Sequence, residues 1–540
     1  MTSISAVELD GADSSYLHNS SFIVEYDDCT LDDAVSVENS EKNNVASSLV
    51  VEYDDCTLDD AVSVENSENN NVGSSLVVEY DDCTLDDAVS VENSENNNVG
   101  VVHSQPILDF DDLQSKINDA NADSTLHLYN DFINKYGSVV TINKSLTIDG
   151  HGHTINFNQH NGLKLTNGFI VIKNLIMKDA YRENGGAIYG DNDARIFIEN
   201  CLFTNNRATN GGAVYNAGSN PIFILNSIFD SNSVTFYGGA VYSQGWIYLD
   251  NSRFASNYAL SGGVAYTQRG VDIGNCTFID NVAASYGGAV YADVVSMEKT
   301  PSHFIANVAY NRKGGAIYAN KFGTDVYYAS FINNRAGMAE TDDGEAVYIN
   351  KESHVTFAYC FFAGNKCSDE GGAIYLDSYK SHLTLRNNMF IDNSAGDEGQ
   401  SVFNCGYYNA IENNFWGGNN PSSDNDQLIE WKATIFQKNV HHSDSNPLSI
   451  VFELAKPQVS VNETATVFIY FCNSNGSKFS GILHGLENIY FIVNGNLNEI
   501  NKNITDNSVT IEFQPQIAGK YVLLSRILDH DFKRQLLNAV

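Results

Sequence analysis

Three pairs of acidic residues precede glycine-containing blocks at nearly equal intervals, and they are the first candidates for chemistry in this 540-residue chain. The intervals are 27 and 28 residues. A chain that coiled once per interval would stack the pairs about 5 Å apart on one edge. Carboxylates that close repel one another, which raises their proton affinity or recruits a cation. Two alternatives follow: a low-affinity calcium site, or a solvated acidic turn in which salt screens the repulsion. The six residues are Asp342, Asp343, Asp369, Glu370, Asp397 and Glu398.

The same acidic edge is where an enzyme would have its active site. Carboxylates that hold calcium, or that act as acid and base, would need a lysine or arginine beside them in a sugar-cleaving site. The nearest basic residues, Arg312 and Lys313, lie one repeat earlier. We therefore expect no catalytic residues, and polysaccharide cleavage near residues 342–398 is the alternative function.

The acidic pairs belong to a diverged repeat that fills roughly residues 160–420. Each copy has a Gly-Gly-small-apolar-Tyr block and a Phe-x-x-Asn block, and successive phenylalanines are 24 to 31 residues apart. Intervals that short cannot hold independent domains, so the copies must share one core. The glycine blocks begin at residues 185, 211, 238, 262, 287, 314 and 371, with decayed copies at 344 and 399, and the second blocks begin at Phe203, Phe229, Phe254, Phe278, Phe304, Phe331, Phe362 and Phe390.

Apolar residues alternate with other residues just upstream of each phenylalanine. The positions five and seven residues before it are apolar in most copies, as with Ile198 and Ile196 before Phe203. A period of two places both side chains on one face of a strand. No helical period lies between copies, which excludes a βαβ arrangement. We therefore predict a parallel β-helix of roughly eight to eleven coils, with ladders of stacked asparagines along its axis.

The cysteines provide a test of this register. Cys201, Cys276 and Cys360 each lie two residues before a repeat phenylalanine. Three coils would separate them in turn, ~14 Å at strand spacing, which exceeds the ~7 Å limit between the Cα atoms of a disulfide. We expect free, buried thiols. The total of nine cysteines is odd, so no disulfide framework is indicated.

Charge is concentrated at the amino-terminal end of the chain. Residues 1–100 hold 24 acidic residues and a single basic residue, Lys42, which gives a net charge of −23. The net charge of the whole chain is −37. This acidity argues against nucleic acid or anionic lipid as a partner. Residues 1–103 are 27-residue repeats with little apolar area, so we expect a disordered spacer. The alternative is that LVVEY and AVSVE form short strands.

Composition divides the rest of the chain into four parts. We expect a cap and first coils at 104–160, because DDLQSKINDA has helical apolar spacing and an open β-helix end needs cover. The β-helix follows at 161–425 and a linker at 426–447. Five strand-like runs in 448–540 predict an immunoglobulin-like β-sandwich, either whole or truncated. No segment has the ~20 apolar residues of a transmembrane span.

Alternation of GGAIY or GGAVY with FxxN resembles the polymorphic-membrane-protein type of repeat, and the whole layout resembles adhesin-like surface proteins of methanogenic archaea. The segments from Leu113 to Asn118 and from Leu146 to Ile155 are similar to the cap of their right-handed, pectate-lyase-like β-helix, and Phe415 to Pro421 is similar to its closing motif. The resemblance implies an extracellular protein on the cell surface. Such proteins are exported, and because residues 1–20 do not look like a signal peptide, we expect a fragment or a misplaced start.

The remaining candidate ligands do not predict a metal site or a cofactor. His151 and His153 look like a metal pair, but DGHGHT belongs to the cap-like turn, so we expect a structural role. His441 and His442 lie in the linker, where solvated side chains are expected. YDDCTLDD lacks the glycine and the terminal glutamate of a calcium-binding EF-hand loop. Tyrosines at the end of each glycine block could contact sugars, but packing between coils is the expected role.

These observations favour an adhesin-like, non-catalytic protein that binds glycans, partner cells or envelope components, or that acts as a stalk. The alternatives are a polysaccharide lyase or glycoside hydrolase on a β-helix, and a purely structural envelope protein.

Overall fold

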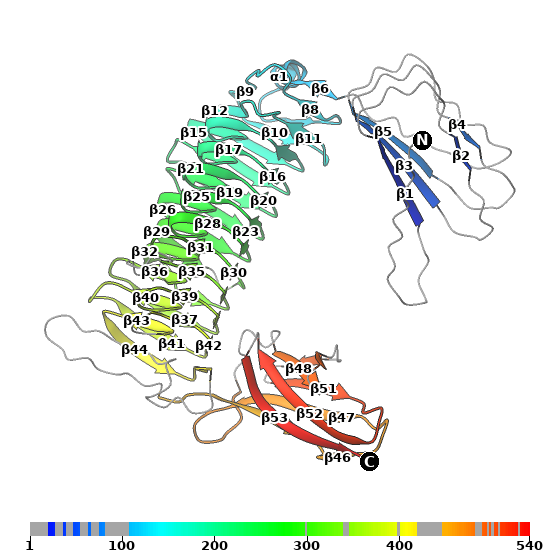
Figure 1. Ribbon diagram of the computed structural model, residues 1–540. Helices are drawn as coiled ribbons and strands as arrows, with labels where there is room; N and C mark the ends of the chain where they lie inside the picture. Colours follow the sequence, from blue (N-terminus) through cyan, green and yellow to red (C-terminus); the bar gives the residue numbers. More distant parts are fainter. Residues whose placement is uncertain are drawn as a thin grey trace. The chain divides into compact units, whose positions relative to one another are not determined.

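The computed structural model describes residues 107–297, 300–337, 345–396, 400–417 and 445–480, most of 489–540, and the backbone of five short strands before residue 82 (Figure 1). The chain divides into two compact units, 1–107 and 108–540. The residues Asp342, Asp343, Asp397, Glu398, His441 and His442 lie outside the described residues.

The described backbone of the first unit consists of short parallel strands. One sheet joins β1 (Ser20–Tyr26), β3 (Ser47–Asp54) and β5 (Ser75–Asp81), and β2 (Ser36–Glu38) pairs with β4 (Ser63–Glu65). Partners are offset by one repeat, with Ser20 opposite Ser47. The disordered spacer that we expected over residues 1–103 stays a prediction, and the described segments have the short strands of the alternative. The reason is that a near-identical repeat offers each strand the same ladder partner in the next copy.

The second unit is nearly all β and contains a right-handed parallel β-solenoid of about 11 turns, as the sequence predicts (Figure 1). A representative coil passes through β16 (Leu202–Thr204), β17 (Arg207–Asn210), β18 (Val214–Asn216) and β19 (Ile222–Leu225). Each strand pairs in parallel with its equivalent in the next coil. The first face of the solenoid is a sheet of β6 (Leu108–Asp109), β8 (Phe132–Ile133), β11 (Thr154–Asn156), β13 (Ile176–Lys178), β16 (Leu202–Thr204), β20 (Ile228–Asp230), β24 (Arg253–Ala255), β27 (Thr277–Ile279), β30 (His303–Ile305), β34 (Ser330–Ile332), β38 (Phe361–Ala363) and β42 (Met389–Ile391).

The other faces of the solenoid are equally regular. The longest sheet contains β7 (Thr125–His127), β9 (Thr141–Ile142), β10 (Leu146–Asp149), β12 (Leu163–Lys173), β15 (Ile188–Glu199), β18 (Val214–Asn216), β19 (Ile222–Leu225), β22 (Val241–Ser243), β23 (Ile247–Asp250), β26 (Ala265–Gly274), β29 (Val290–Met297), β32 (Ile317–Phe322), β36 (Val347–Ile349), β40 (Ile374–Leu376) and β43 (Val402–Asn404). A third sheet contains β14 (Tyr181–Asn184), β17 (Arg207–Asn210), β21 (Ser233–Tyr237), β25 (Tyr258–Ser261), β28 (Val282–Tyr286), β31 (Val308–Ala309), β35 (Arg335–Ala336) and β39 (Lys366–Cys367). In the last coils β33 (Val326–Tyr327), β37 (His354–Ala358), β41 (His382–Arg386) and β44 (Tyr407–Glu412) form a further sheet.

The glycine blocks make the turns between the third sheet and the longest sheet. Gly211 has φ +62°, and a Cβ there would lie 2.3 Å from the carbonyl oxygen of Val214. The second glycine of the same block, Gly212, passes so close to the next coil that a Cβ would lie 2.1 Å from the carbonyl oxygen of Gly239. Both positions therefore need glycine, the first for its backbone angle and the second for the approach of neighbouring coils.

The repeat phenylalanines stack along the interior in the predicted register. All eight are fully buried, and successive ring centroids are 4.6 to 5.3 Å apart. Trp416 ends the stack, with its centroid 4.5 Å from that of Phe390. The apolar pairs upstream, such as Ile196 and Ile198, fill the same core. Each repeat is therefore one coil, and like side chains form columns.

The asparagines of the same motif form a buried ladder, which confirms that prediction as well. From Asn206 to Asn365, each side-chain amide donates to the Oδ1 of the asparagine in the next coil at 2.9 to 3.0 Å. From Asn232 to Asn393, it also donates to the carbonyl oxygen of a repeat phenylalanine, whereas Asn206 donates to that of Met177. The same Oδ1 also accepts the backbone N–H of the preceding asparagine, as Asn257 does from Asn232 at 3.0 Å. The ladder runs through Asn206, Asn232, Asn257, Asn281, Asn307, Asn334, Asn365 and Asn393.

Cys201, Cys276 and Cys360 are free and buried, as the register predicts. Burial raises the pKa of each thiol to about 12. These cysteines therefore act as small apolar side chains of the core.

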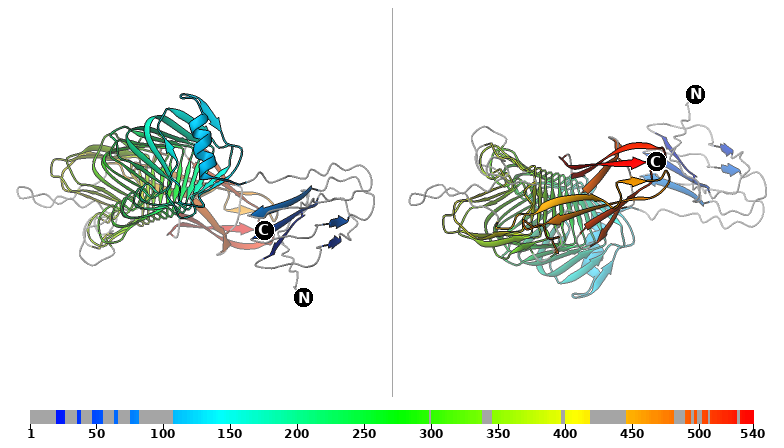
Figure 2. Two further views of the ribbon diagram at one scale, coloured as in Figure 1. Left: turned by 90° about the horizontal axis from the view of Figure 1, so that it is seen from above. Right: turned by 90° about the horizontal axis from the view of Figure 1, so that it is seen from below.

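One helix, α1 (Phe110–Asp119), caps the first coils and confirms the predicted capping helix (Figure 2). Asp109 is its N-cap and forms a capping box with Asp112. Phe110, Leu113 and Ile117 are buried against the first coils. Within the described residues, no helix is long and apolar enough to cross a membrane.

The carboxyl-terminal part consists of mainly antiparallel sheets that share one apolar core. One sheet joins β45 (Ser449–Leu454), β47 (Ala465–Cys472), β51 (Ser508–Phe513) and β50 (Lys502–Thr505), and the other joins β46 (Gln458–Val459), β53 (His530–Ala539), β52 (Gly519–Ile527), β48 (Ile489–Val493) and β49 (Asn496–Leu497). The same apolar cluster includes Phe361, Met389 and Phe415 of the last coils. The ring of Phe415 packs edge-on against Phe471, with the centroids 5.2 Å apart.

Replacing a ladder asparagine should destabilise the fold strongly. In Asn257→Ala the backbone N–H and the side-chain amide of Asn232 lose their shared acceptor inside the core. Each buried unsatisfied group costs about 1–3 kcal/mol, so we expect the free energy of unfolding to fall by roughly 2–5 kcal/mol, measured by urea denaturation. Asn192→Ala, on the exposed part of β15, is the matched control. Equal, small effects of both substitutions would contradict the ladder's role.

Candidate functional site

The predicted acidic edge is described only in part. Of its six residues, Asp369 and Glu370 are described, and Glu370 is 9% exposed. The stack of carboxylates that we expected therefore stays a prediction. The structure adds a carboxylate that the sequence analysis did not single out. Glu345 occupies the second-glycine position of a decayed block and is fully buried, with its backbone oxygen accepting from the N–H of Gly315.

The basic residue that lies one coil earlier, Lys313, contacts Tyr348 of the next coil. The Nζ of Lys313 donates to the hydroxyl of Tyr348 at 3.1 Å and lies 4.3 Å from the centroid of its ring. The Tyr348 hydroxyl in turn donates to Oδ2 of Asp377 at 2.5 Å. Burial, and then the hydrogen bond to this carboxylate, raises the pKa of Tyr348 far above its usual range. A general acid or base must reach its substrate. Tyr348 is only 2% exposed, so it is better suited to holding coils together than to catalysis.

The tyrosines of the glycine blocks form a second continuous stack. Their side chains alternate with the buried core residues of the same strands, so they point away from the interior, and successive centroids are 4.6 to 5.7 Å apart. The stack becomes fully buried toward its end, where Tyr375 is 5% and Phe403 is 0% exposed. Packing between coils, the expected role, is what the structure shows for this row.

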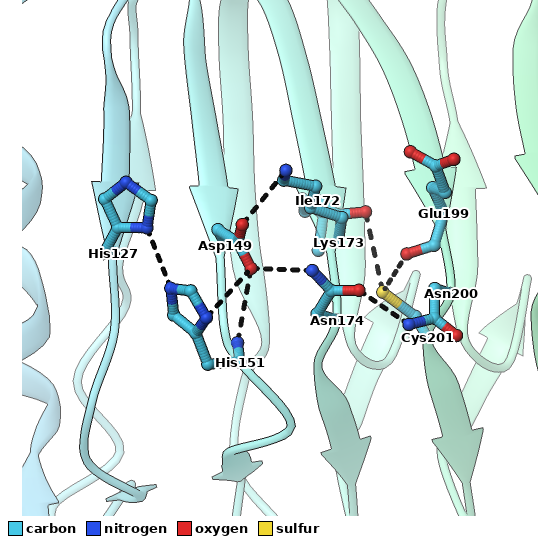
Figure 3. A network of polar contacts seen from close by, with 9 residues as sticks. All are labelled: His127, Asp149, His151, Ile172, Lys173, Asn174, Glu199, Asn200 and Cys201. Carbon is cyan, nitrogen blue, oxygen red and sulfur yellow. Dashed lines mark hydrogen bonds and ion pairs between the residues drawn. The ribbon is translucent and has the colours of Figure 1, made fainter.

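A polar cluster at the amino-terminal end of the solenoid joins residues that the sequence did not link (Figure 3). His127 ends β7, Asp149 ends β10 directly opposite it, and His151 lies in the turn that follows. The Nδ1 of His127 is 2.8 Å from the Nε2 of His151. The Nδ1 of His151 is 3.9 Å from Oδ1 of Asp149. One ligand atom from each of the three residues lies within 4.8 Å of the other two.

His151 and His153 do not form the pair that their spacing suggested. The Nδ1 of His153 is instead 2.9 Å from Oδ1 of Asp131, which also accepts from the backbone N–H of Thr154 at 2.7 Å. His127 was missed because it lies 24 residues before His151, in a coil without the repeat motif. The one available signal was the register of the first coils, which places His127 beside Asp149.

Asp149 is fixed by several donors. Lys173 Nζ lies 3.0 Å from its Oδ2, and Asn174 Nδ2 donates to its Oδ1 at 2.7 Å (Figure 3). Burial acts to raise the pKa of Asp149, but the hydrogen bonds from Asn174 and Lys173 together outweigh it and lower the pKa to about 2. The ring of Tyr129 stacks on His151 with the centroids 4.9 Å apart. The carboxylate of Asp149 is therefore ionised near neutral pH. The imidazole of His151 is oriented by its stacking on Tyr129.

An outward row of aromatic side chains lies on the longest sheet, over β12, β15, β19 and β23. Phe169 is 47% exposed, and Phe197, Phe223 and Tyr248 are partly exposed. Phe197, Phe223 and Tyr248 are in register on successive strands, and the rings of Phe223 and Tyr248 stack with centroids 4.8 Å apart. This row was not predicted from the sequence. Its signal was the position six residues before each repeat phenylalanine, between two inward-facing residues.

Comparisons with known proteins support the architecture. Residues 137–298 match the family model described as the right handed beta helix region, and residues 359–377 match that of the Chlamydia polymorphic membrane protein repeat. No curated protein and no solved structure matches the chain. The chain therefore contains a β-helix with a polymorphic-membrane-protein type of repeat, and that repeat family is surface-exposed.

The tyrosine stack predicts a loss of stability at alkaline pH. Burial, and then the neighbouring tyrosines Tyr266 and Tyr286, raise the pKa of Tyr291 from 10.0 to about 12. The folded protein holds this proton more tightly than the unfolded chain, so the stability contribution is complete below pH 10 and is lost as the pH rises through about 12. In Tyr291→Phe we expect the melting temperature, followed by circular dichroism, to fall less over this range. Tyr136→Phe, on the exposed surface, is the control, and an identical profile for all three proteins would refute the prediction.

Proposed function

We propose that this chain is a non-catalytic, adhesin-like binding protein of the cell surface, whose solenoid presents the outward aromatic row to a carbohydrate. The observation that carries the proposal is the row formed by Phe169, Phe197, Phe223 and Tyr248, which is partly exposed along neighbouring coils. Sugar rings have apolar C–H faces that pack flat on aromatic rings, and their hydroxyl groups need polar partners at the rim.

The side chains of the row point away from the core, because the residues on either side of them along each strand point into it. Ile196 and Ile198 on either side of Phe197, and Ile222 and Ile224 on either side of Phe223, are buried. Polar residues at these outward positions would leave the packing of the interior unchanged. Contiguous exposed apolar side chains mark interaction sites in soluble proteins.

Polar groups lie where a sugar would need them. Arg195, opposite Phe169 in the sheet, and Asp193 are exposed beside the row. The row runs from coil to coil, so it matches an extended polysaccharide better than a compact ligand. Glycans of partner cells or of the envelope have this chemistry.

The likeness of one repeat to polymorphic membrane proteins supports a location at the cell surface. We extend this to a relationship with the adhesin-like proteins of methanogenic archaea, which the order of cap, repeats and closing motif favours. We also assign the two mainly antiparallel sheets of the carboxyl-terminal part to an immunoglobulin-like module, because they share one core.

Removing the row should remove carbohydrate binding without unfolding the protein. An aromatic contact contributes about 0.5–1.5 kcal/mol, so we expect Phe197→Ser, Phe223→Ser and Tyr248→Ser each to weaken binding about two- to tenfold on a glycan array and in solution titrations. Tyr258→Ser on β25 is the matched control, because Tyr258 is 47% exposed but lies on another sheet. If the unaltered protein bound no glycan, the proposal would fall, and a purely structural envelope role would be favoured.

A polysaccharide lyase or hydrolase is the second candidate, favoured by the contact of Lys313 with Tyr348, whose hydroxyl donates to the carboxylate of Asp377. The protein should be incubated with pectins and other uronic polysaccharides, with and without calcium. We expect neither new reducing ends nor unsaturated products. Product formation that Asp369→Ala abolishes would overturn the non-catalytic proposal.

A further inference from the structure

We propose that His127, Asp149 and His151 bind one divalent transition-metal ion, for which zinc is the best match, at the amino-terminal end of the solenoid. The proposal goes beyond carbohydrate binding and does not depend on it. Two imidazole nitrogens and one carboxylate oxygen are a common protein ligand set for zinc, and they leave a coordination position open. The hard ions calcium and magnesium prefer sites made of oxygen atoms alone, so they fit this set poorly.

The distances are close to those of a metal site. One ligand atom from each residue lies within 4.8 Å of the others, and the facing nitrogens of the two histidines are 2.8 Å apart. Ligands bound tetrahedrally at 2.0–2.2 Å lie roughly 3.3 Å from one another. The histidine pair therefore has to open slightly, and one imidazole has to move toward Asp149. Both histidines are exposed, so their rings can turn, while the main chain that carries them stays in place.

Neighbouring residues fix the orientation of two of the proposed ligands, Asp149 and His151. Asn174 and Lys173 contact the two oxygens of Asp149 (Figure 3). The ring of Tyr129 stacks on that of His151. Hydrogen bonds and packing of this kind around the ligands typically change metal affinity 10- to 100-fold. Lys173 has the opposite effect, because its ammonium group already neutralises the carboxylate that the metal needs. The ion and Lys173 therefore compete for Asp149.

A purely structural network explains only part of this cluster. Asn200 donates to Asn174 at 2.6 Å and Asn174 donates to Asp149, so an exposed amide ladder ends on the carboxylate. That ladder does not require His127. It also does not account for two imidazole nitrogens that face one another at 2.8 Å, where one N–H donates to the other nitrogen and a cation can replace this proton once the pair opens.

Metal binding would connect the first coil to the second. His127 belongs to β7, and Asp149 and His151 belong to β10 and the turn after it. Terminal repeats of a solenoid have a neighbour on one side only, so they are the first to open. A ligand that binds only the folded state adds stability. Zinc should therefore protect this end of the solenoid from unfolding.

The experiment uses the full chain, stripped of metal with a chelator. Zinc is titrated by calorimetry, and Co²⁺ serves as a spectroscopic probe because nitrogen and oxygen ligation gives d–d bands without the intense charge-transfer band of thiolates. We expect one equivalent to bind. His127→Ala and His151→Ala should each weaken binding tenfold or more, and zinc should raise the melting temperature of the unaltered protein but of neither variant.

Lys173→Gln separates a real site from a folding defect. This substitution frees Asp149 from its competing cation, so we expect zinc to bind severalfold more tightly, and misfolding cannot produce that gain. His153→Ala, and the double substitution of His441 and His442 by alanine, are controls that should bind zinc unchanged. The proposal is overturned if these controls lose the equivalent, or if the His127, His151 and Lys173 variants all bind zinc as the unaltered protein does.

Discussion

The structure depends on a chain of buried amides. In the Phe-x-x-Asn motif the asparagine is fully buried, and both its donors and its acceptor are used between coils. An amide group left unpaired in an apolar interior is costly. Each coil must therefore adopt the register in which its asparagine pairs with the asparagine of the next coil. Slippage by a single residue would break the three hydrogen bonds that each ladder asparagine makes to other coils, and would turn the apolar pairs outward. The ladder therefore fixes the register that the stacked phenylalanines fill.

Every outward row of side chains has the register that the asparagine ladder fixes. Phe197, Phe223 and Tyr248 lie in line because Ile196, Ile222 and Ile247 beside them are in line in the core. The interior restricts the inward positions and the glycine turns, and it leaves the outward positions free to change. A solenoid thus offers long rows of side chains at strand spacing, and a binding surface can be built on it without altering the fold.

The repeat could be predicted from the sequence because its determinants recur. Phe203 and Asn206 are followed by equivalent residues in each later coil, so the ladders, the inward pairs and the buried cysteines were all predictable. His127 could not be predicted in the same way. Its partners Asp149 and His151 belong to the cap coils, where the Phe-x-x-Asn motif does not occur and contacts depend on how each loop closes. The burial of Glu345 was not predicted for a related reason, since Glu345 replaces a glycine in a decayed block.

The direction of the exposed amide ladder explains why a carboxylate lies at its end. Asn200 and Asn174 each donate toward the preceding coil, so the residue at position 149 has only to accept. An asparagine there would accept equally well, but its own amide group would then need an acceptor next to His127 and His151. An aspartate has no surplus donor, and Lys173 balances its charge. The requirement of the ladder for a terminal acceptor thus places a negative charge beside two facing imidazoles, which is the combination that a transition-metal ion needs.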